Sequence, residues 1–242
     1  MSVIVSNLHQ DIILKENTKQ KIYQDLNTSF NELNIKLEKH SDLELLVYNV
    51  NGTINANLDE DSVLKIYNIS LCEKNTDFLV NVNLNGKYGN VHLINVILGV
   101  NDSKASCDFQ IKHFAGHTTS LLETYAISKN QSKLILNNNA YIYQGNKQCD
   151  ARQMTKGLNL SEVSSIKAQP NLFIDEYDVI ASHNAAIGSI DKDELFYLMS
   201  RGLPLEKAQE MVVLGFIQPL LEKIEDEQTQ EVLYNSFTNL LK

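Results

Sequence analysis

The chain is poor in several residue types that mark particular protein classes. It has no tryptophan, and only three prolines and three cysteines among its 242 residues. The cysteines Cys72, Cys107 and Cys149 are odd in number, widely spaced and without a CxxC pair. This pattern argues against a disulfide framework and against a tetrahedral metal site, which needs paired ligands at short spacing. We expect each cysteine to be a small buried hydrophobic residue.

Positive charge and long apolar runs are also scarce. Lys and Arg number 21 against 30 Asp and Glu, a net charge of −9. A protein that binds nucleic acids or anionic membrane surfaces needs a cluster of basic residues, so neither is an expected partner. No apolar run reaches the ~18 residues of a membrane-spanning helix, and the N-terminus lacks the n-region and h-region of a signal peptide. We therefore expect a cytoplasmic protein.

Residues 43–190 have the composition and the alternating pattern of a β-rich body. Their short segments are rich in Val, Ile, Leu, Tyr and Phe, and many alternate apolar with polar residues, which is typical of half-buried strands. Twelve Asn fall between 49 and 101, and Asn both tolerates left-handed turn geometry and forms amide ladders. The pattern predicts an all-β fold, either a sandwich, a barrel or a β-helix, and the period alone does not choose among them.

Residues 1–42 form a poorly specified lead-in with scattered aliphatic residues. A short helix could lie within the segment 14–40, although its Asn content disfavours one.

The pattern becomes helical over 191–242. Asp191 and Glu194 fit a capping box at the start of the first helix. Gly202 suits a left-handed cap at its end. The residues on its apolar face are Leu195, Phe196, Leu198 and Met199.

Two further helices are expected. Pro204 suits the first turn of the second, and Pro219 should kink or break it near Gln218. The third covers about 226–241. Its apolar face, Leu233, Phe237, Leu240 and Leu241, must be buried against the body or against another chain.

His183, in the stretch DVIASHNAAIGSID, is the first candidate for chemistry. An imidazole can bind a metal or cluster, or carry a proton. It can also serve as a structural group at the end of a strand. No second ligand lies at metal-binding spacing, so the residue pattern by itself favours the structural role.

The other candidates are weaker. His113 and His117 are four residues apart, but they lie in a stretch that fits strand, turn, strand, where they would be polar turn residues. Cys149 has no adjacent His to activate it. Glu176 and Asp178 would share one face of a strand as a possible acid–base pair, or lie at a solvated strand end. No phosphate loop, GxGxxG or GxSxG motif is present.

The segment from about 145 to 224 nevertheless resembles the SufB/SufD family of iron–sulfur cluster assembly scaffolds. Upstream of His183, Asp150 and Gln153 match an Asp-x-x-Gln segment of that family. The other matching residues are Pro170, Leu172, Ile174, Asp178, Val179, Ser182, His183, Gly188, Asp191, Leu195, Phe196, Tyr197, Leu198, Ser200, Arg201, Gly202, Gly215 and Phe216. The resemblance weakens back to about residue 43, and we find none before it. The chain is shorter than most members, which predicts a reduced N-terminal region.

The resemblance implies a fold and a set of partners. Members form a right-handed parallel β-helix with helical ends, so we expect a β-helix body over 43–190 and a C-terminal α-helical tail. The family builds clusters in a complex with the ATPase SufC, which docks on the C-terminal helices, while β-helix ends pair two subunits. The residues expected to bind a partner are Leu195, Phe196, Tyr197, Arg201, Gly202, Met211 and Phe216.

Within the family the chain resembles the SufD type, a non-catalytic scaffold. The SufB type has a cysteine in its Leu-rich strand segment and a glutamate just after the Ser-His pair. Counted without gaps from His183, these positions are occupied here by Thr155 and Asn184. The resemblance places His183 near the subunit interface and implicates it in cluster formation. A lone His is a poor cluster site, so further ligands would come from a second subunit. We expect no stably bound cofactor, and a transient iron–sulfur cluster only in the assembled complex.

Two alternatives stay open beside this hypothesis. One is a degenerate SufD relative that binds only the ATPase. The other is a β-helix protein that binds or cleaves polysaccharide, although the sequence shows no signal peptide and no evident carboxylate–Arg site. The second subunit of the pair is expected to be either a SufB-like chain or another copy of this one.

Overall fold

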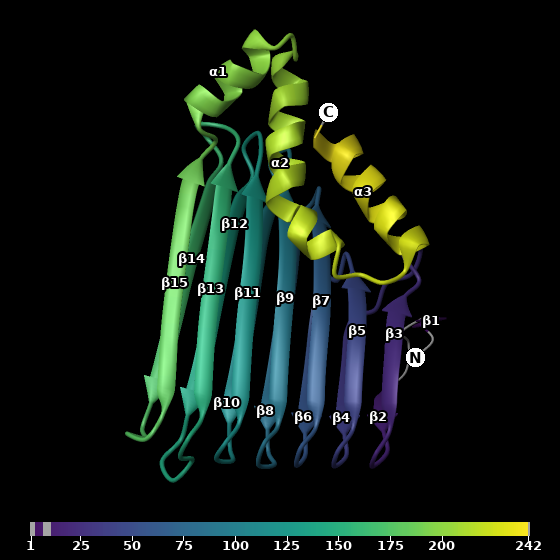
Figure 1. Ribbon diagram of the computed structural model, residues 1–242, viewed down its shortest axis with the longest axis vertical. Helices are drawn as coiled ribbons and strands as arrows, with labels where there is room; N and C mark the ends of the chain where they lie inside the picture. The colour runs from purple at the N-terminus through teal and green to yellow at the C-terminus, as the bar shows by residue number, and fades with distance from the viewer. Residues whose placement is uncertain (1–2, 7–10, 242) are drawn as a thin grey trace.

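The computed structural model describes residues 3–6 and 11–241, which form a two-sheet parallel β-solenoid followed by three helices (Figure 1). Odd-numbered strands make an eight-stranded sheet, here called sheet A: β1 Val3–Ser6, β3 Lys19–Gln24, β5 Asp42–Tyr48, β7 Val63–Cys72, β9 Asn90–Gly99, β11 Thr119–Ser128, β13 Asp150–Asn159 and β15 Ile180–Ser189. Even-numbered strands make the seven-stranded sheet B: β2 Ile12–Leu14, β4 Glu32–Leu37, β6 Gly52–Leu58, β8 Thr76–Leu84, β10 Lys104–His113, β12 Lys133–Ile142 and β14 Ser165–Ile174. The helices are α1 Lys192–Ser200, α2 Leu205–Leu221 and α3 Glu227–Leu241.

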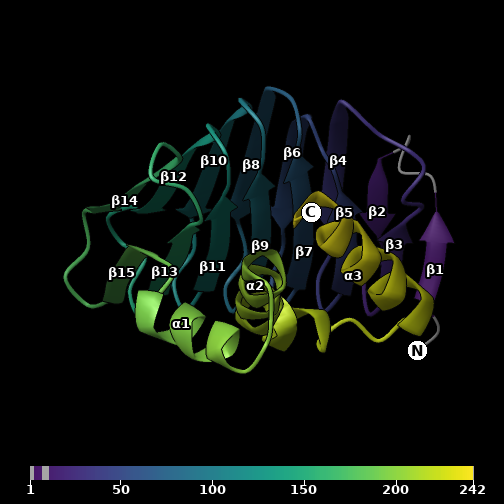
Figure 2. The same ribbon diagram turned by 90° about the horizontal axis from the view of Figure 1, so that it is seen from above.

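The predicted β-helix is confirmed. Each strand pairs in parallel with the strand two positions further along the chain, so every coil adds one strand to each sheet. Figure 2 shows the two sheets as facing layers. Strand β10 alternates buried and less buried residues along its whole length, because one face lies on the core between the sheets and the other faces outward.

Sheet A is covered on its outer face by α2 and α3 (Figures 1 and 2). Strand β9 therefore alternates only at its start and is buried at every position from Leu93 to Gly99. Its outward residues Ile94 and Val96 join a second core with Val213 and Phe237 of the helices. The helices thus bury their apolar stripes against the solenoid of their own chain.

The solenoid continues into the predicted lead-in, and the short helix considered for 14–40 is wrong. Leu33, Ile35 and Leu37 of β4 point into the inter-sheet core, where tertiary burial outweighs the weak helical propensity of the segment. The division of the chain at 1–42, 43–190 and 191–242 stays a prediction.

Asparagine has both of the roles expected for it. Asn49 and Asn101 adopt left-handed turn conformations, with φ of 50° and 59°. On the outer face of sheet B, the Asn55 amide donates to Asn34 Oδ1 at 3.1 Å and accepts from Asn81 at 3.0 Å. Such ladders satisfy amide groups along successive coils.

The helix boundaries agree with the expected caps except at Pro219. Asp191 Oδ1 accepts from the backbone N–H groups of Asp193 and Glu194, and Gly202 has a φ of +94°. Pro204 is the N-cap of α2. The helix does not break near Gln218 but runs to Leu221: Pro219 lacks a backbone N–H to donate, yet the helical ladder continues after it, with the backbone N–H of Glu222 bonded to Gln218 O. No helix in the described part of the chain is both long and apolar enough to cross a membrane.

Candidate functional site

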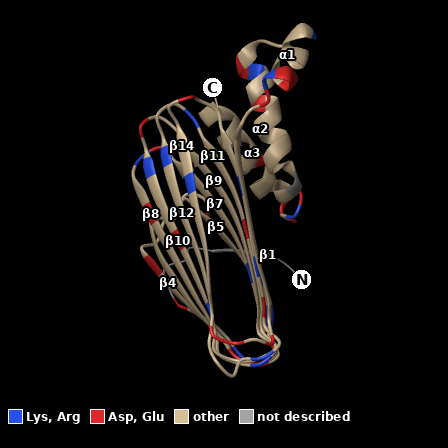
Figure 3. Cartoon of the chain, turned by 90° about the vertical axis from the view of Figure 1, so that its left-hand side faces the viewer, with Lys and Arg blue, Asp and Glu red and all other residues tan. Residues whose placement is uncertain are grey.

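The solenoid ends in an uncovered coil made of β14 and β15. Within the described residues, β14 pairs only with β12 and β15 only with β13, so each presents one open edge. The two strands contain one charged residue, Lys167. Figure 3 views the molecule from this end and shows little charge along its strands. An open, nearly uncharged strand edge is a template for pairing with another chain.

His183 lies on β15 and belongs to the inward-facing row of this last coil. It is the Cα partner of Gln153 on β13, and Gln153 points into the solenoid, where it is only 4% exposed. Residues paired in register share a face of the sheet, so His183 lies over Gln153. It is exposed because no further coil covers it.

A buried polar cluster lies under this coil. Gln153 Nε2 donates to the carbonyl oxygen of Asn171 at 3.2 Å, and Asn138 Nδ2 donates to Thr155 Oγ1 at 2.9 Å. The side-chain carbonyl oxygens of Gln153 and Asn138 have no hydrogen-bond partner among the described residues. Two buried acceptors therefore lie directly beneath the end of the solenoid that carries His183.

Large apolar side chains surround the same end. Tyr177, in the loop between β14 and β15, is fully exposed. Four others are between 38% and 58% exposed: Phe173, Ile174, Ile180 and Ile187. Together with the open strand edges they form one surface, which we call the end surface. Gathered exposed apolar residues of this kind mark protein–protein contacts.

Helix α1 adjoins the end surface and has no buried residue. Phe196 and Tyr197 of the predicted partner-binding set are 72% and 57% exposed, and Leu195 is half-buried. The Arg201 guanidinium lies over the Tyr197 ring, 5.3 Å from its centroid. Gly202 follows directly and ends the helix.

The two other predicted partner-binding residues lie on opposite sides of α2. Met211 is 56% exposed, whereas Phe216 faces sheet A and packs edge-on against Tyr125, with ring centroids 5.6 Å apart. Met211 lines a groove of about 390 Å³. The other groove residues are Leu203, Lys207, Glu210, Leu214, Gly215, Gln218 and Tyr234.

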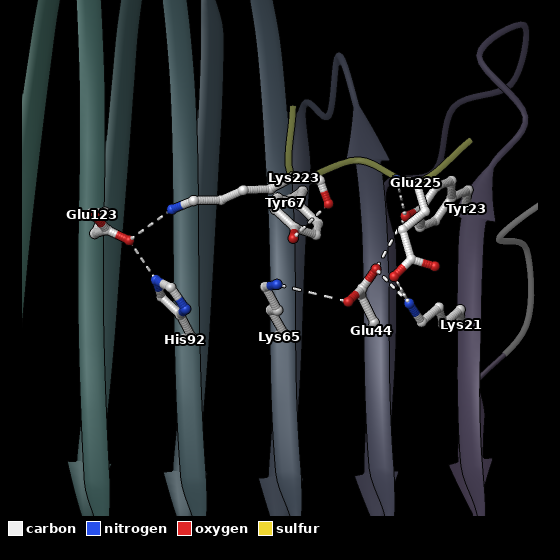
Figure 4. Close-up of polar contacts among 9 residues, drawn as sticks. All are labelled: Lys21, Tyr23, Glu44, Lys65, Tyr67, His92, Glu123, Lys223 and Glu225. Carbon is white, nitrogen blue, oxygen red and sulfur yellow. Dashed lines mark hydrogen bonds and ion pairs between the residues drawn. The ribbon is translucent and has the colours of Figure 1, made fainter. Parts of the chain in front are cut away.

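A band of charged and aromatic residues joins the outer face of sheet A to the segment between α2 and α3 (Figure 4). We call it the clasp. Its members are Lys21, Tyr23, Glu44, Lys65, Tyr67, His92, Glu123, Lys223 and Glu225. Glu44 lies 3.7 Å from the Nζ atoms of both Lys21 and Lys65. His92 Nε2 lies 2.5 Å from Glu123 Oε2, and this contact holds the pKa of the Glu123 carboxyl below its usual value.

The clasp holds the linker between the helices at several points. Tyr67 Oη donates to the carbonyl oxygen of Lys223 at 3.2 Å, and the backbone N–H of Glu225 donates to Tyr23 Oη at 3.4 Å. Between these bonds, the side chain of Ile224 is buried in the second core, between sheet A and the helices. The linker is therefore fixed on the sheet by the buried Ile224 side chain, by two hydrogen bonds and by the ion pairs of Glu225 with Lys21 and of Lys223 with Glu123.

His113 and His117 do lie in a strand–turn–strand, as expected, but only His117 is a turn residue. His113 ends β10 and is fully buried, with Nδ1 2.7 Å from Thr118 Oγ1 and Nε2 2.9 Å from Ser120 Oγ. Burial lowers its pKa to about 4. The prediction of a polar turn residue is wrong for His113, because both ring nitrogens have partners inside the fold.

The remaining candidates have structural roles. All three cysteines are buried, as predicted, and Cys149 lies in a turn with Sγ 3.2 Å from the carbonyl oxygen of Asn146. Glu176 and Asp178 are not on a strand but in the loop after β14. There the Glu176 carboxylate accepts backbone N–H bonds from Gly145, Tyr177 and Asp178, which lower its pKa. It fixes the loop rather than forming an acid–base pair.

No group of three or more His, Cys, Asp and Glu side chains in the described ranges is arranged to hold a metal ion. His183 thus has no group of companion ligands within the described part of the chain. Sequence reasoning missed the buried acceptors beneath it. The length of one coil could have located Gln153, because Gln153 and His183 are one coil apart in the sequence.

Comparison with known proteins gives a consistent result. The family model described as SUF system FeS cluster assembly, SufBD core domain, matches residues 12–216 and so extends further toward the N-terminus than the resemblance seen in the sequence. The iron–sulfur cluster assembly protein SufD of Bacillus subtilis is 32% identical over 65% of this chain and 36% of its own length. SufD of Escherichia coli is 26% identical over 60% of this chain and 34% of its own length. A SufBD family protein of Pyrococcus horikoshii is 43% identical over 37% of this chain and 19% of its own length. The matches thus span about a third or less of these relatives.

Proposed function

The chain belongs to the SufBD core family of the SUF system for iron–sulfur cluster assembly, and from this premise we propose that it is a SufD-like, non-catalytic scaffold subunit of a cluster assembly complex. The observation that carries the proposal is the position of His183. It faces inward on the last coil of the solenoid, at an open end with exposed apolar residues, whose two strands carry one charged residue.

The end surface is where a second SufBD-type solenoid would pair. Its open strand edges supply backbone hydrogen bonds, and its exposed apolar residues supply buried area on association. Pairing there would enclose His183 between two chains. The partner would be a SufB-like chain or a second copy of this one.

His183 would then act on an iron–sulfur cluster as cargo, together with ligands from the partner. A neutral imidazole nitrogen is a known cluster ligand, although clusters usually need several thiolates or a thiolate–imidazole mixture. The buried side-chain amide of Gln153 places a polar group directly beneath the site. A transient cluster at a two-chain site is consistent with the single ligand present here.

The helical tail would dock a SufC-like ATPase. Helix α1 buries none of its residues against the solenoid, and the groove beside Met211 on α2 is open. Exposed apolar groups on helices are suited to hold a partner domain. The clasp fixes the same helices to sheet A, so movement of the docked ATPase would be transmitted to the solenoid.

The His183 role is tested by cluster yield in the assembled complex. The variant His183→Ala should retain complex formation but lose most of the cluster formed in anaerobic reconstitution, measured by iron and sulfide content. Ser182→Ala, on the outward face of the same strand, is the matched control and should behave as wild type. A His183→Ala complex with wild-type cluster yield contradicts the cluster role of His183.

The docking role is tested by ATPase affinity. Met211→Asp places a charge in the groove and should weaken binding of the SufC-like ATPase at least tenfold, about 1.4 kcal/mol. Val232→Asp makes the same kind of change at an exposed position of α3 outside the groove. Equal affinities for the two variants, measured by calorimetry, contradict docking at the groove.

A further inference from the structure

Four aromatic rings form a stack on sheet B and its adjoining turns. Phe114 and Tyr143 are stacked with centroids 4.9 Å apart and an interplanar angle of 13°. Tyr143 and Tyr141 are 6.5 Å apart at 13°, and Tyr141 and Phe173 are 4.7 Å apart at 10°. The nearly parallel rings lead from β10 through β12 to β14, in the direction in which coils are added.

The stack stops at the open edge of the solenoid. Phe173 lies on β14, the last strand of sheet B, and one face of its ring covers Tyr141. The ring is 49% exposed, and no other aromatic ring among the described residues stacks on it. Phe114, at the opposite end of the stack, is 47% exposed. The two phenylalanines are thus matched in exposure and in number of stacked neighbours, but only Phe173 is on the terminal strand.

We propose that the strand of a second SufBD-type solenoid that pairs with β14 places a planar side chain, an aromatic ring or a guanidinium group, on the open face of Phe173. The inference rests on the proposed pairing at the end surface. Paired strands lie about 4.8 Å apart, which agrees with the 4.7 Å between Tyr141 and Phe173. The next strand therefore brings a side chain to stacking distance.

Phe173 has a role that the rest of the end surface cannot supply. The outward face of β15 carries Ile180 at its start and then only the small, uncharged residues Ser182, Asn184, Ala186 and Gly188, so it offers no aromatic ring. Small uniform side chains specify strand register weakly, whereas one large ring that must meet a planar partner fixes it. Phe173 is therefore the residue that selects register and partner on the sheet B side.

The geometry favours a protein side chain over a sugar ring as the occupant. Phe114 covers Tyr143 and Tyr141 covers Phe173 across successive coils, while Tyr141 and Tyr143 lie side by side two residues apart. A glycan platform needs several exposed ring faces, whereas only the terminal face of Phe173 is directed toward an incoming strand. The open backbone edge beside Phe173 is suited to hydrogen bonding with an extended polypeptide strand.

The test compares Phe173→Ala with Phe114→Ala in the full chain. Each variant removes one half-exposed ring from one end of the same stack, so both should lose similar thermal stability. Sedimentation equilibrium with the SufB-like chain, and of the chain alone, gives the pairing constant. We expect Phe173→Ala to weaken pairing about tenfold and Phe114→Ala to leave it unchanged.

Two further variants separate stacking from simple burial. Phe173→Tyr keeps a planar ring and should retain pairing, whereas Phe173→Leu keeps apolar area and should weaken it as Phe173→Ala does. Equal pairing by the Ala variants, or full pairing by Phe173→Leu, overturns the inference while the proposed pairing stands. A wild-type chain that pairs with neither itself nor the SufB-like chain overturns both.

Discussion

At the scale of single residues, Cys149 takes a position that a hydroxyl residue occupies in several of the other stacked turns. Ser41, Ser62 and Thr118 each donate a side-chain bond to the carbonyl oxygen three residues earlier. Cys149 Sγ makes the same contact with Asn146. Cys107, in contrast, is fully buried in the apolar inter-sheet core.

Serine should therefore be accepted at one cysteine and not at the other. Cys149→Ser should change the free energy of unfolding by less than about 0.5 kcal/mol, because the hydroxyl finds the same acceptor. Cys107→Ser should cost about 1–3 kcal/mol, because it buries an unpaired hydroxyl. Urea denaturation of both variants measures the difference. Equal losses would contradict the role assigned to the turn position.

His113 makes stability depend on pH. Its folded pKa of about 4 lies below the ordinary 6.5, so between these values the unfolded chain binds a proton that the folded chain excludes. Stability should fall as the pH drops from about 6.5 to about 4, by an amount on the order of 3 kcal/mol. His113→Gln should be less stable at pH 7 but should lose less stability over that range.

The measurement is chemical denaturation of the two proteins at a series of pH values. The two proteins differ only at residue 113, so the difference in slope reports His113. Parallel curves for wild type and His113→Gln would show that the buried imidazole does not exclude a proton.

At the scale of elements, the tail is fixed to sheet A chiefly by apolar contact. Ile224 is 1% exposed, while the Glu225 side chain, which pairs with Lys21 at 2.5 Å, remains 62% exposed. Exposed ion pairs add little to stability, whereas removing a buried Ile side chain costs about 2–5 kcal/mol. The linker should therefore depend on Ile224 far more than on its charges.

Hydrogen exchange checks this ranking. Ile224→Ala should speed exchange across α2 and α3 while the strands of sheet B remain protected. Glu225→Gln should leave exchange in both helices unchanged. Faster exchange in Glu225→Gln than in Ile224→Ala would mean that the charged contacts of the clasp hold the tail.

The sequence predicted strands and helices best where one local signal determined them. Alternation located β10, and Asp191 and Gly202 marked the ends of α1. The apolar run of β9 also carried information on tail packing, because continuous burial shows that a sheet is covered on both faces. Leu33 and Ile35 were missed since their short strand gains its stability from coils distant in sequence.

At the scale of the whole molecule, coil length decided what could be predicted. Paired residues are 21 positions apart from Asp42 to Val63 but 31 apart from Thr119 to Asp150, so no fixed repeat is visible. Without a repeat, the period could not select the β-helix; the family resemblance selected it. For the same reason the sequence singled out His183 and Gln153 separately but did not place one beneath the other, and it did not single out Phe173 at the end of the aromatic stack.

We assign different partners to two surfaces of the molecule. The end surface carries His183 and the open strand edges, and the helical tail carries the exposed residues of α1 and α2. A scaffold that pairs with one chain and docks another needs two such surfaces on one rigid body. This arrangement is the central claim of our proposal.

Native mass spectrometry of the full chain, co-expressed with its SufC-like ATPase and the SufB-like chain, tests that claim most directly. We predict a complex that contains all three proteins, from which Met211→Asp removes the ATPase on this chain without dissociating the SufB-like partner. A chain that binds neither protein would contradict the scaffold assignment.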